Sequence, residues 1–582
     1  MRIHWITINL QEQLETRLKE SFAVCHLTSI DTNVDCTISK HSIEQLRQII
    51  SIYLSIDKLS DLMMLYRKFV LHDQLSQIFI PRPELTHSGS DKEIAAETLN
   101  SMYSKALKIL DAQLYHVKEQ IIRCSPESSE PLSDFDCLVG GFWPETIDLI
   151  CNNLPEIFSP GHPDRFYSLY TVSMNFIEAV ETKTWSTKQL VNLRNHPSYS
   201  MFINKWSLPV YFQIRFQEIA ANVENTMKKG LIKIEESRNS CLIEVTEVVI
   251  CQLNRCWEKG IYVDKLMHRF WKLTLQILSR FSSFIDEQIK SAQENKANTS
   301  TTTTTTSPTS DSTLPTRSTD YFPELLIYFF VDCFRLVDYV RLELKEQIFT
   351  CLKQRLTTQT MNNDDSVNYE TTLNECLEQS CERLIKSIDS IMDLIIQKIQ
   401  QICSNSIRQV LDIPRQYRWT NRDFPSHASS YVSNIINPLM KLNSLGSCLS
   451  QSIPNAQPAL CTLIQKCVTK VTHDYTVQLS EVSTSVRKME DSLRRLRNVR
   501  HGSSQISNQS QSVNDSGKFH SDDKIRHQLY LDAKAYSDQV KNFWSLDREC
   551  TCELDDFMGQ IDTTRTEANV CNMNTILTVS QE

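Results

Sequence analysis

The chain has 582 residues, a formal net charge of −9 at pH 7 and only 10 glycines. This glycine content is under a quarter of the roughly 7% found in average proteins, and the glycine-rich motifs of dinucleotide-binding folds, P-loop enzymes and α/β-hydrolases are all missing from the sequence. The negative charge argues against a nucleic-acid binder, which needs a basic field to release phosphate counterions.

Apolar residues recur with helical spacing along most of the chain. The first such run consists of Leu46, Ile49, Ile50, Tyr53 and Leu54, continued by Leu62, Leu65, Tyr66, Phe69 and Val70. Prolines separate the runs, and the sequence contains no Asn-Gly or Asp-Gly dipeptide of the kind that closes hairpins. The patterns therefore predict an all-α fold of many antiparallel helices.

Residues 204–227 fit two periodicities at once. Alternation of Val210, Phe212, Ile214 and Phe216 is typical of a half-buried strand. A second pattern, with steps of three and four residues, predicts a helix with one apolar face: Phe212, Phe216, Ile219, Val223 and Met227. The helical pattern is longer, Ser207 is a suitable N-cap and Pro209 falls in the tolerant first turn. We therefore expect a buried helix.

Two low-complexity segments, 296–320 and 501–522, are rich in Ser, Thr, Asn and Gln and bury too little apolar area to offset their ordering entropy. They divide the chain into expected parts: an N-terminal helical bundle region at 1–295, a C-terminal helical region at 321–500 and a helical tail at 523–582. Each low-complexity segment is expected to be a linker.

The most apolar stretch follows the first linker, at residues 321–340. It carries four charged residues: Glu324, Asp332, Arg335 and Asp338. A membrane-spanning helix needs about 20 residues nearly free of charge, so this stretch predicts a buried helix instead. The first ten residues, MRIHWITINL, are too short an apolar run for a signal peptide. We expect any membrane attachment to be peripheral, through partners or the protein surface.

The strongest periodic signal is a heptad seam near the second linker. It comprises Tyr475, Leu479, Val482, Val486, Met489, Leu493 and Leu496. Beside it lie six cations: Arg487, Lys488, Arg494, Arg495, Arg497 and Arg500. Such a basic face suits acidic lipid headgroups or an acidic partner. A solvated coiled-coil face, partly balanced by Glu490 and Asp491, explains the same pattern and is the simpler interpretation.

Metal and thiol chemistry find little support. The 19 cysteines include no C-x-x-C pair, and the closest spacings are Cys251/Cys256, Cys376/Cys381, Cys461/Cys467 and Cys550/Cys552. None of these has the paired spacing of a tetrahedral zinc site. Reduced, mostly buried thiols in a reducing compartment are expected.

Catalytic motifs are equally scarce. Four histidines lie in or beside helical patterns, at His26, His41, His268 and His473, and no H-E-x-x-H motif occurs. We therefore assign no catalytic, cofactor-binding or metal-binding residue and expect no enzyme activity and no cofactor. The alternative is a soluble helical regulator or enzyme with an unrecognised site, which would show convergent titratable groups with perturbed pKa values in a pocket.

Seven segments, taken in order, resemble the family of subunit 2 of the conserved oligomeric Golgi complex. They begin with SPGHPDRFYSLYTVSMNF (159–176), NLRNHPSY (192–199), NKWSLPVYFQIRFQEIA (204–220) and MHRFWKLTLQILSRF (267–281). They continue with IPRQYRWTNRDFPSHASSYV (413–432), THDYTVQLSEVSTSVRKMEDSLRRLR (472–497) and SDDKIRHQLYLDAKAY (521–536). Agreement of seven segments in order is more specific than any single motif, and it covers residues 40–540 approximately.

The resemblance implies a helical-bundle rod of the multisubunit tethering complex type, without enzymatic activity. It implies tethering of vesicles in intra-Golgi retrograde transport and a role in Golgi organisation, at the cytosolic face of Golgi membranes. Expected partners are the other subunits of the complex and, indirectly, Rab GTPases, SNAREs, golgins and coat proteins. Family members begin with a long partner-binding region to which MRIHWITINL has no counterpart, so the chain is expected to be shortened at its N-terminus.

Overall fold

A computed structural model describes residues 59–86, 91–124, 136–235, 241–297, 322–358, 363–418, 422–501, 521–543 and 555–559, with a few residues elsewhere. Within this part, extended pairing is limited to one isolated bridge between Lys233 and Ile243, and helices make up the rest of the regular structure. The predicted all-α class is confirmed there. Apart from their ends, the segments 296–320 and 501–522 lie outside the described residues, as does most of the chain before residue 59.

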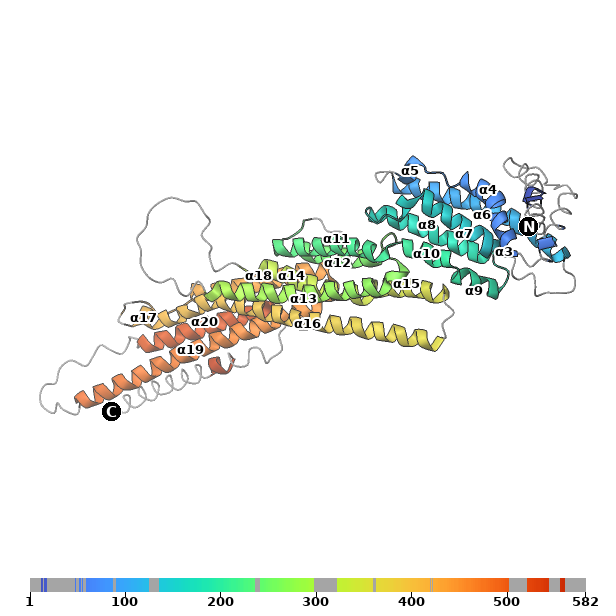
Figure 1. Cartoon of the computed structure of the whole chain (residues 1–582). Helices are drawn as coiled ribbons and strands as arrows, with labels where there is room; N and C mark the ends of the chain where they lie inside the picture. Colours follow the sequence, from blue (N-terminus) through green and yellow to red (C-terminus); the bar gives the residue numbers. More distant parts are fainter. Residues whose placement is uncertain are drawn as a thin grey trace, which may run out of the picture. The chain divides into compact units, whose positions relative to one another are not determined.

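The chain divides into two compact units. The first contains Met1–Ile219 and Glu258–Phe270, and the second contains Ala220–Trp257 and Trp271–Glu582. The longer helices of the first unit are α3 (Leu59–Tyr66), α6 (Lys92–Cys124), α7 (Trp143–Asn153), α8 (Pro163–Thr182), α9 (Thr187–Asn195) and α10 (Pro197–Lys205) (Figure 1). Two helices, α11 (Leu208–Lys229) and α13 (Met267–Ala297), contribute residues to both units.

Helix α11 settles the choice between strand and helix for residues 204–227. Phe212 is 8% exposed, whereas Val210, which the alternating pattern would bury beside it, is 49% exposed. Ile219, Val223 and Met227 are buried further along the same face. The ring of Phe212 meets that of Phe270 edge-on, with centroids 5.2 Å apart. The helical spacing therefore identified the buried face correctly.

A buried arginine links α11 to α8 inside the first unit. Arg215 is 1% exposed, and its guanidinium pairs with Asp164 at the start of α8 and, at 3.1 Å, with Glu218. The Tyr211 hydroxyl accepts a hydrogen bond from Arg215 and donates one of 2.8 Å to the Ile261 carbonyl. Two of the segments quoted above, 159–176 and 204–220, are thus joined through the ion pair between Asp164 and Arg215.

The second unit is a bundle of long helices. Its helices are α12 (Glu244–Trp257), α14 (Glu324–Tyr339), α15 (Lys345–Thr358), α16 (Asn363–Ile407), α17 (Ile413–Tyr417), α18 (Ser430–Ser452), α19 (Gln457–His501) and α20 (Ser521–Phe543). Helices α16, α18 and α19 pack on one another, α14 packs on α16, and α20 packs on α17, α18 and α19. At Gly446 a Cβ would lie 2.9 Å from the Ile464 side chain, so glycine permits the close approach of α18 to α19.

Asp332 holds the start of α12 against α14. Within the stretch 321–340, Glu324–Tyr339 form a mostly buried helix as predicted, and Asp332 within it is fully buried. Its carboxylate accepts the backbone N–H of Leu242 at 2.8 Å and that of Ile243 at 2.7 Å, just before α12 begins. These donors have no intrahelical acceptor. Burial raises the pKa of Asp332 to about 7.

Substitution at two neighbouring positions of α11 tests the assigned face. Phe212→Asp should lower the free energy of unfolding by several kcal/mol, because it buries a carboxylate and removes an aromatic side chain. Val210→Asp, two residues away and half exposed, should change it by less than about 0.5 kcal/mol. Urea denaturation followed by circular dichroism measures both. Equal losses in the two variants would contradict the assignment.

The raised pKa of Asp332 predicts a pH dependence of stability. Because the folded value of about 7 lies above the ordinary 3.8, the native carboxyl binds its proton more tightly than the unfolded one. Raising the pH through that window should therefore lower the unfolding free energy of the unsubstituted chain relative to Asp332→Asn, whose amide oxygen still accepts both N–H groups. Denaturation at several pH values measures the difference. An unsubstituted chain that becomes more stable relative to Asp332→Asn as the pH rises would contradict the prediction.

Candidate interaction surface

The predicted heptad seam lies on α19 in two different environments. Tyr475, Leu479, Val482 and Val486 are buried in the bundle. The next three members of the same stripe are exposed: Met489 is 48%, Leu493 36% and Leu496 62% accessible to solvent. Since large apolar side chains in one stripe normally pack against another element, the exposed half is a candidate docking surface.

The change of environment coincides with the start of α20. Arg526, in the second turn of α20, pairs with Glu490 of α19, while the Tyr536 hydroxyl lies 3.0 Å from that of Thr472. The two helices therefore run antiparallel. The end of α19 extends past the first turns of α20 (Figure 1). The apolar stripe of α19 continues past the part of the bundle that buries it.

Cations flank the exposed part of the stripe. Arg487, Lys488 and Arg495 are exposed, as is Asp491, whereas Glu490 is engaged by Arg526. The side chains of Arg494, Arg497 and Arg500, also part of the predicted basic face, lie outside the described residues. The described charges are thus mainly positive beside an apolar stripe. This combination suits an amphipathic helix with acidic flanks.

A buried polar network fastens α20 to α18 and to the buried half of the α19 stripe. The Asp532 carboxylate accepts the Ser429 N–H at 2.6 Å, the Ser429 hydroxyl at 2.9 Å and the Tyr431 hydroxyl at 2.8 Å. Gln528 donates to it from one turn away at 2.8 Å, and the Tyr431 hydroxyl also lies 3.2 Å from that of Tyr475 in the seam. Burial raises the pKa of Asp532. The network orients α18, α19 and α20 together.

Sequence reasoning missed this network. Asp532 and Ser429 are separated by about a hundred residues, and neither lies in a motif with a recognisable spacing. The sequence predicted this region only as a helical tail, in which Leu529 and Tyr536 now prove to lie on the buried face of α20. No local signal distinguishes Asp532 from the exposed acidic residues nearby.

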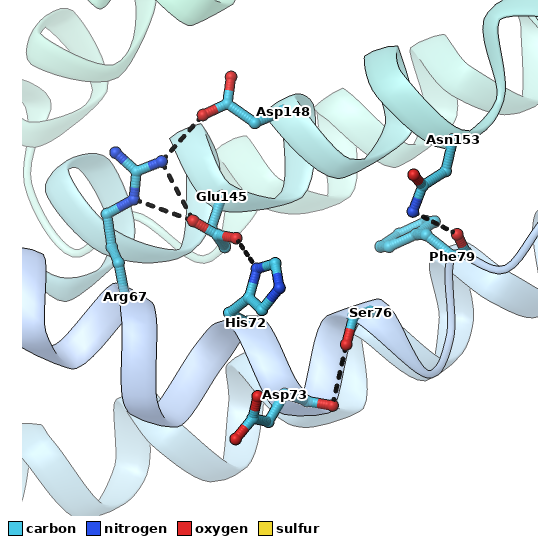
Figure 2. Close-up of polar contacts among 8 residues, drawn as sticks. All are labelled: Arg67, His72, Asp73, Ser76, Phe79, Glu145, Asp148 and Asn153. Carbon is cyan, nitrogen blue, oxygen red and sulfur yellow. Dashed lines mark hydrogen bonds and ion pairs between the residues drawn. The ribbon is translucent and has the colours of Figure 1, made fainter.

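The first unit contains a cluster that combines a histidine, an arginine and two carboxylates (Figure 2). Glu145 of α7 accepts from Arg67 Nε at 3.2 Å and lies 2.8 Å from His72 Nδ1, while Arg67 also pairs with Asp148 at 2.9 Å. Each of the four side chains thus has a hydrogen-bond or ion-pair partner within the cluster. The arrangement joins residues 67–72 to α7 and thereby has a structural explanation that requires no substrate.

The histidines and cysteines noted in the sequence form no common site among the described residues. His268 and His473 are exposed on α13 and α19, and His26 and His41 lie outside the described residues. Cys256, Cys381 and Cys467 are buried, and burial raises the pKa of Cys381 to about 11 and those of Cys256 and Cys467 to about 12. These three thiols are therefore protonated and unreactive near neutral pH. Cys550 and Cys552 lie outside the described residues.

Among the described residues, no group of three or more His, Cys, Asp or Glu side chains is placed to hold a metal ion. Among the helices described, none combines the length and the apolar character needed to cross a bilayer.

Two substitutions on α19 test the division of the seam. Val486→Asp should lower the free energy of unfolding by several kcal/mol, because Val486 is 1% exposed in the bundle. Leu496→Asp should change it by less than about 0.5 kcal/mol, because that side chain is already in solvent. Thermal or urea unfolding measures both. A large loss of stability in Leu496→Asp would show that the end of α19 belongs to the core.

Comparison with known proteins identifies a family that covers this surface. The family model described as "COG complex component, COG2, C-terminal" matches residues 204–533, more than half of the chain, and includes all of α19. Conserved oligomeric Golgi complex subunit 2 of Homo sapiens is 29% identical over 557 residues, which cover 93% of this chain and 69% of that protein.

Two further relatives carry the same name. The Drosophila melanogaster protein is 26% identical over 541 residues, covering 91% of this chain and 68% of its own length. The Arabidopsis thaliana protein is 24% identical over 432 residues, covering 72% of this chain and 52% of its own length. Together with the family model, these matches confirm the resemblance carried by the seven sequence segments: the chain belongs to the family of conserved oligomeric Golgi complex subunit 2.

Proposed function

We propose that this chain is a non-enzymatic subunit of the conserved oligomeric Golgi complex, which tethers vesicles in intra-Golgi retrograde transport and maintains Golgi organisation. The observation that carries the proposal is the family match over residues 204–533. This region contains the apolar and basic surface at the end of α19. A subunit of an assembly needs such a surface, because partner binding requires apolar area that the folded chain leaves uncovered.

The partners we propose are the other subunits of the complex and, indirectly, Rab GTPases, SNAREs, golgins and coat proteins. The names of the relatives support the first part, since each is called a subunit of an oligomeric complex. We place the protein peripherally on the cytosolic face of Golgi membranes. Attachment would then come from the assembly and from exposed cations such as Arg487, Lys488 and Arg495.

The structural roles of two buried carboxylates support the non-enzymatic part of the proposal. Asp332 and Asp532 have raised pKa values, which makes such groups candidates for catalysis. Both are buried, and both use their oxygens to accept hydrogen bonds from neighbouring helices. Each carboxylate thus has a structural role in holding its unit together.

Affinity purification of the tagged full chain from its own cells tests this function. The unsubstituted chain should recover other subunits of the Golgi complex, identified by mass spectrometry. Leu493→Asp/Leu496→Asp should recover at least tenfold less, because two carboxylates would interrupt the apolar stripe. The matched control is Leu342→Asp/Leu411→Asp, which alters two leucines of the same unit that are 64% and 51% exposed. The control should recover the unsubstituted amount.

The outcomes distinguish a failure of the proposed function from a failure of the proposed role of the α19 surface. Failure of the unsubstituted chain to recover any sibling subunit would contradict the proposed function. Recovery by the unsubstituted chain and by both double variants alike would retain the function but contradict the role of the α19 surface.

A further inference from the structure

An ion pair between two helices borders the exposed end of α19. Arg526, in the second turn of α20, pairs with Glu490 of α19. The side chain of Arg526 is 26% exposed and that of Glu490 is 23% exposed, so the pair lies at the boundary between the bundle and solvent. It therefore contributes to the protein surface as well as to the packing of α20 on α19.

Glu490 lies beside the exposed apolar stripe. It directly follows Met489 in α19 and precedes Leu493 by three residues, and side chains three residues apart are neighbours on a helix. Met489 is 48% and Leu493 36% exposed. A partner helix that packs on this stripe would bring its flanking residues close to the carboxylate of Glu490.

The net charge around the stripe depends on Arg526. Near the stripe, the described charged residues of α19 and of the first turn of α20 include cations and carboxylates in equal number: Arg487, Lys488 and Arg495 against Glu490, Asp491 and Asp523. The other two charged residues of that turn are engaged elsewhere, since Asp522 lies 3.6 Å from Arg418 and Lys524 donates to the Arg422 carbonyl at 2.6 Å. Arg526 is therefore the cation that leaves these residues with a net positive charge.

Such a charge decides which partner can bind. Opposite charges across an interface speed association, whereas like charges brought together there cost binding free energy. A carboxylate beside the stripe would repel the acidic flank of a docking helix. Its pairing with Arg526 removes that repulsion.

We propose that Arg526 makes the α19 surface specific for an acidic partner, by neutralising Glu490 and giving the surface its net positive charge. The partner is an amphipathic helix with acidic flanks, contributed by another subunit of the complex. Arg526 is then a specificity-determining residue supplied by α20 to a stripe that belongs to α19. This inference rests on the function proposed above and names the chemistry of the partner at the same surface.

Three charge substitutions in the tagged full chain, compared by recovery of sibling subunits, test the proposal. Arg526→Gln should lower the recovery at least about threefold, because Glu490 then keeps its negative charge beside the stripe. Glu490→Gln should raise the recovery about twofold or more, because Arg526 then adds an uncompensated positive charge. Arg526→Gln/Glu490→Gln should restore it to within about twofold of the unsubstituted chain, because its net charge equals that of the intact pair.

An ion pair with only a structural role would give a different order. Loss of either partner would loosen α20 from α19, so both single variants would recover less, and the double variant would not be restored. The matched control is Arg341→Gln, which opens the exposed pair of Arg341 with Glu378 between two other elements of the same unit. The control should recover the unsubstituted amount. Circular dichroism of each variant shows whether the helical bundle is retained.

Added salt gives a second measurement. Because salt screens charges near the surface, the recoveries of Arg526→Gln and Glu490→Gln should converge as the salt concentration of the extract is raised. Equal recovery in all variants, a lower recovery in Glu490→Gln, or a difference that salt leaves unchanged would each overturn the proposal while retaining the function. Failure of the unsubstituted chain to recover any sibling subunit would contradict the function and this proposal with it.

Discussion

The apolar stripe of α19 is longer than the part of the bundle that buries it. The C-terminal region therefore has a buried section, in which the stripe packs on other helices, and an exposed section at the end of α19. Burial of an apolar helix face is the main source of stability in a helical protein. From Tyr475 to Val486 that burial is provided by the neighbouring helices of the second unit. From Met489 onward the members of the stripe are exposed, so the stripe provides stability in its first half and a candidate docking surface in its second.

Each unit is further organised by a few buried polar groups that connect distant parts of the sequence. Arg215 connects α11 to α8, Asp332 connects α14 to the start of α12, and Asp532 connects α20 to α18. A buried charge without partners is costly, so these groups tolerate few alternative packings of their helices. The last of these connections also reaches α19, through the Tyr431 hydroxyl beside that of Tyr475 in the buried half of the stripe.

The periodicity of apolar residues was sufficient to predict the helices. It was insufficient to predict which other elements pack against each helix. The spacing from Phe212 to Met227 identified both the helix and its buried face, because a long pattern with steps of three and four fits only one regular structure. The heptad pattern of α19 has the same form at Val486 and at Leu493, yet one side chain is buried and the other exposed. That difference depends on where α20 begins in space, which no local pattern encodes. The sequence did not predict the pairing of Asp164 with Arg215 for the same reason, because these two residues lie in separate segments of the chain.

We propose the end of α19 as an intermolecular surface in the assembled complex. The most direct measurement is an electron cryomicroscopy map of the Golgi complex that contains this chain, resolved well enough to assign side chains on α19. We expect a helix of another subunit packed against Leu493 and Leu496, with acidic residues near Arg495. A map in which the end of α19 faces solvent while other parts of the chain contact the sibling subunits would contradict it.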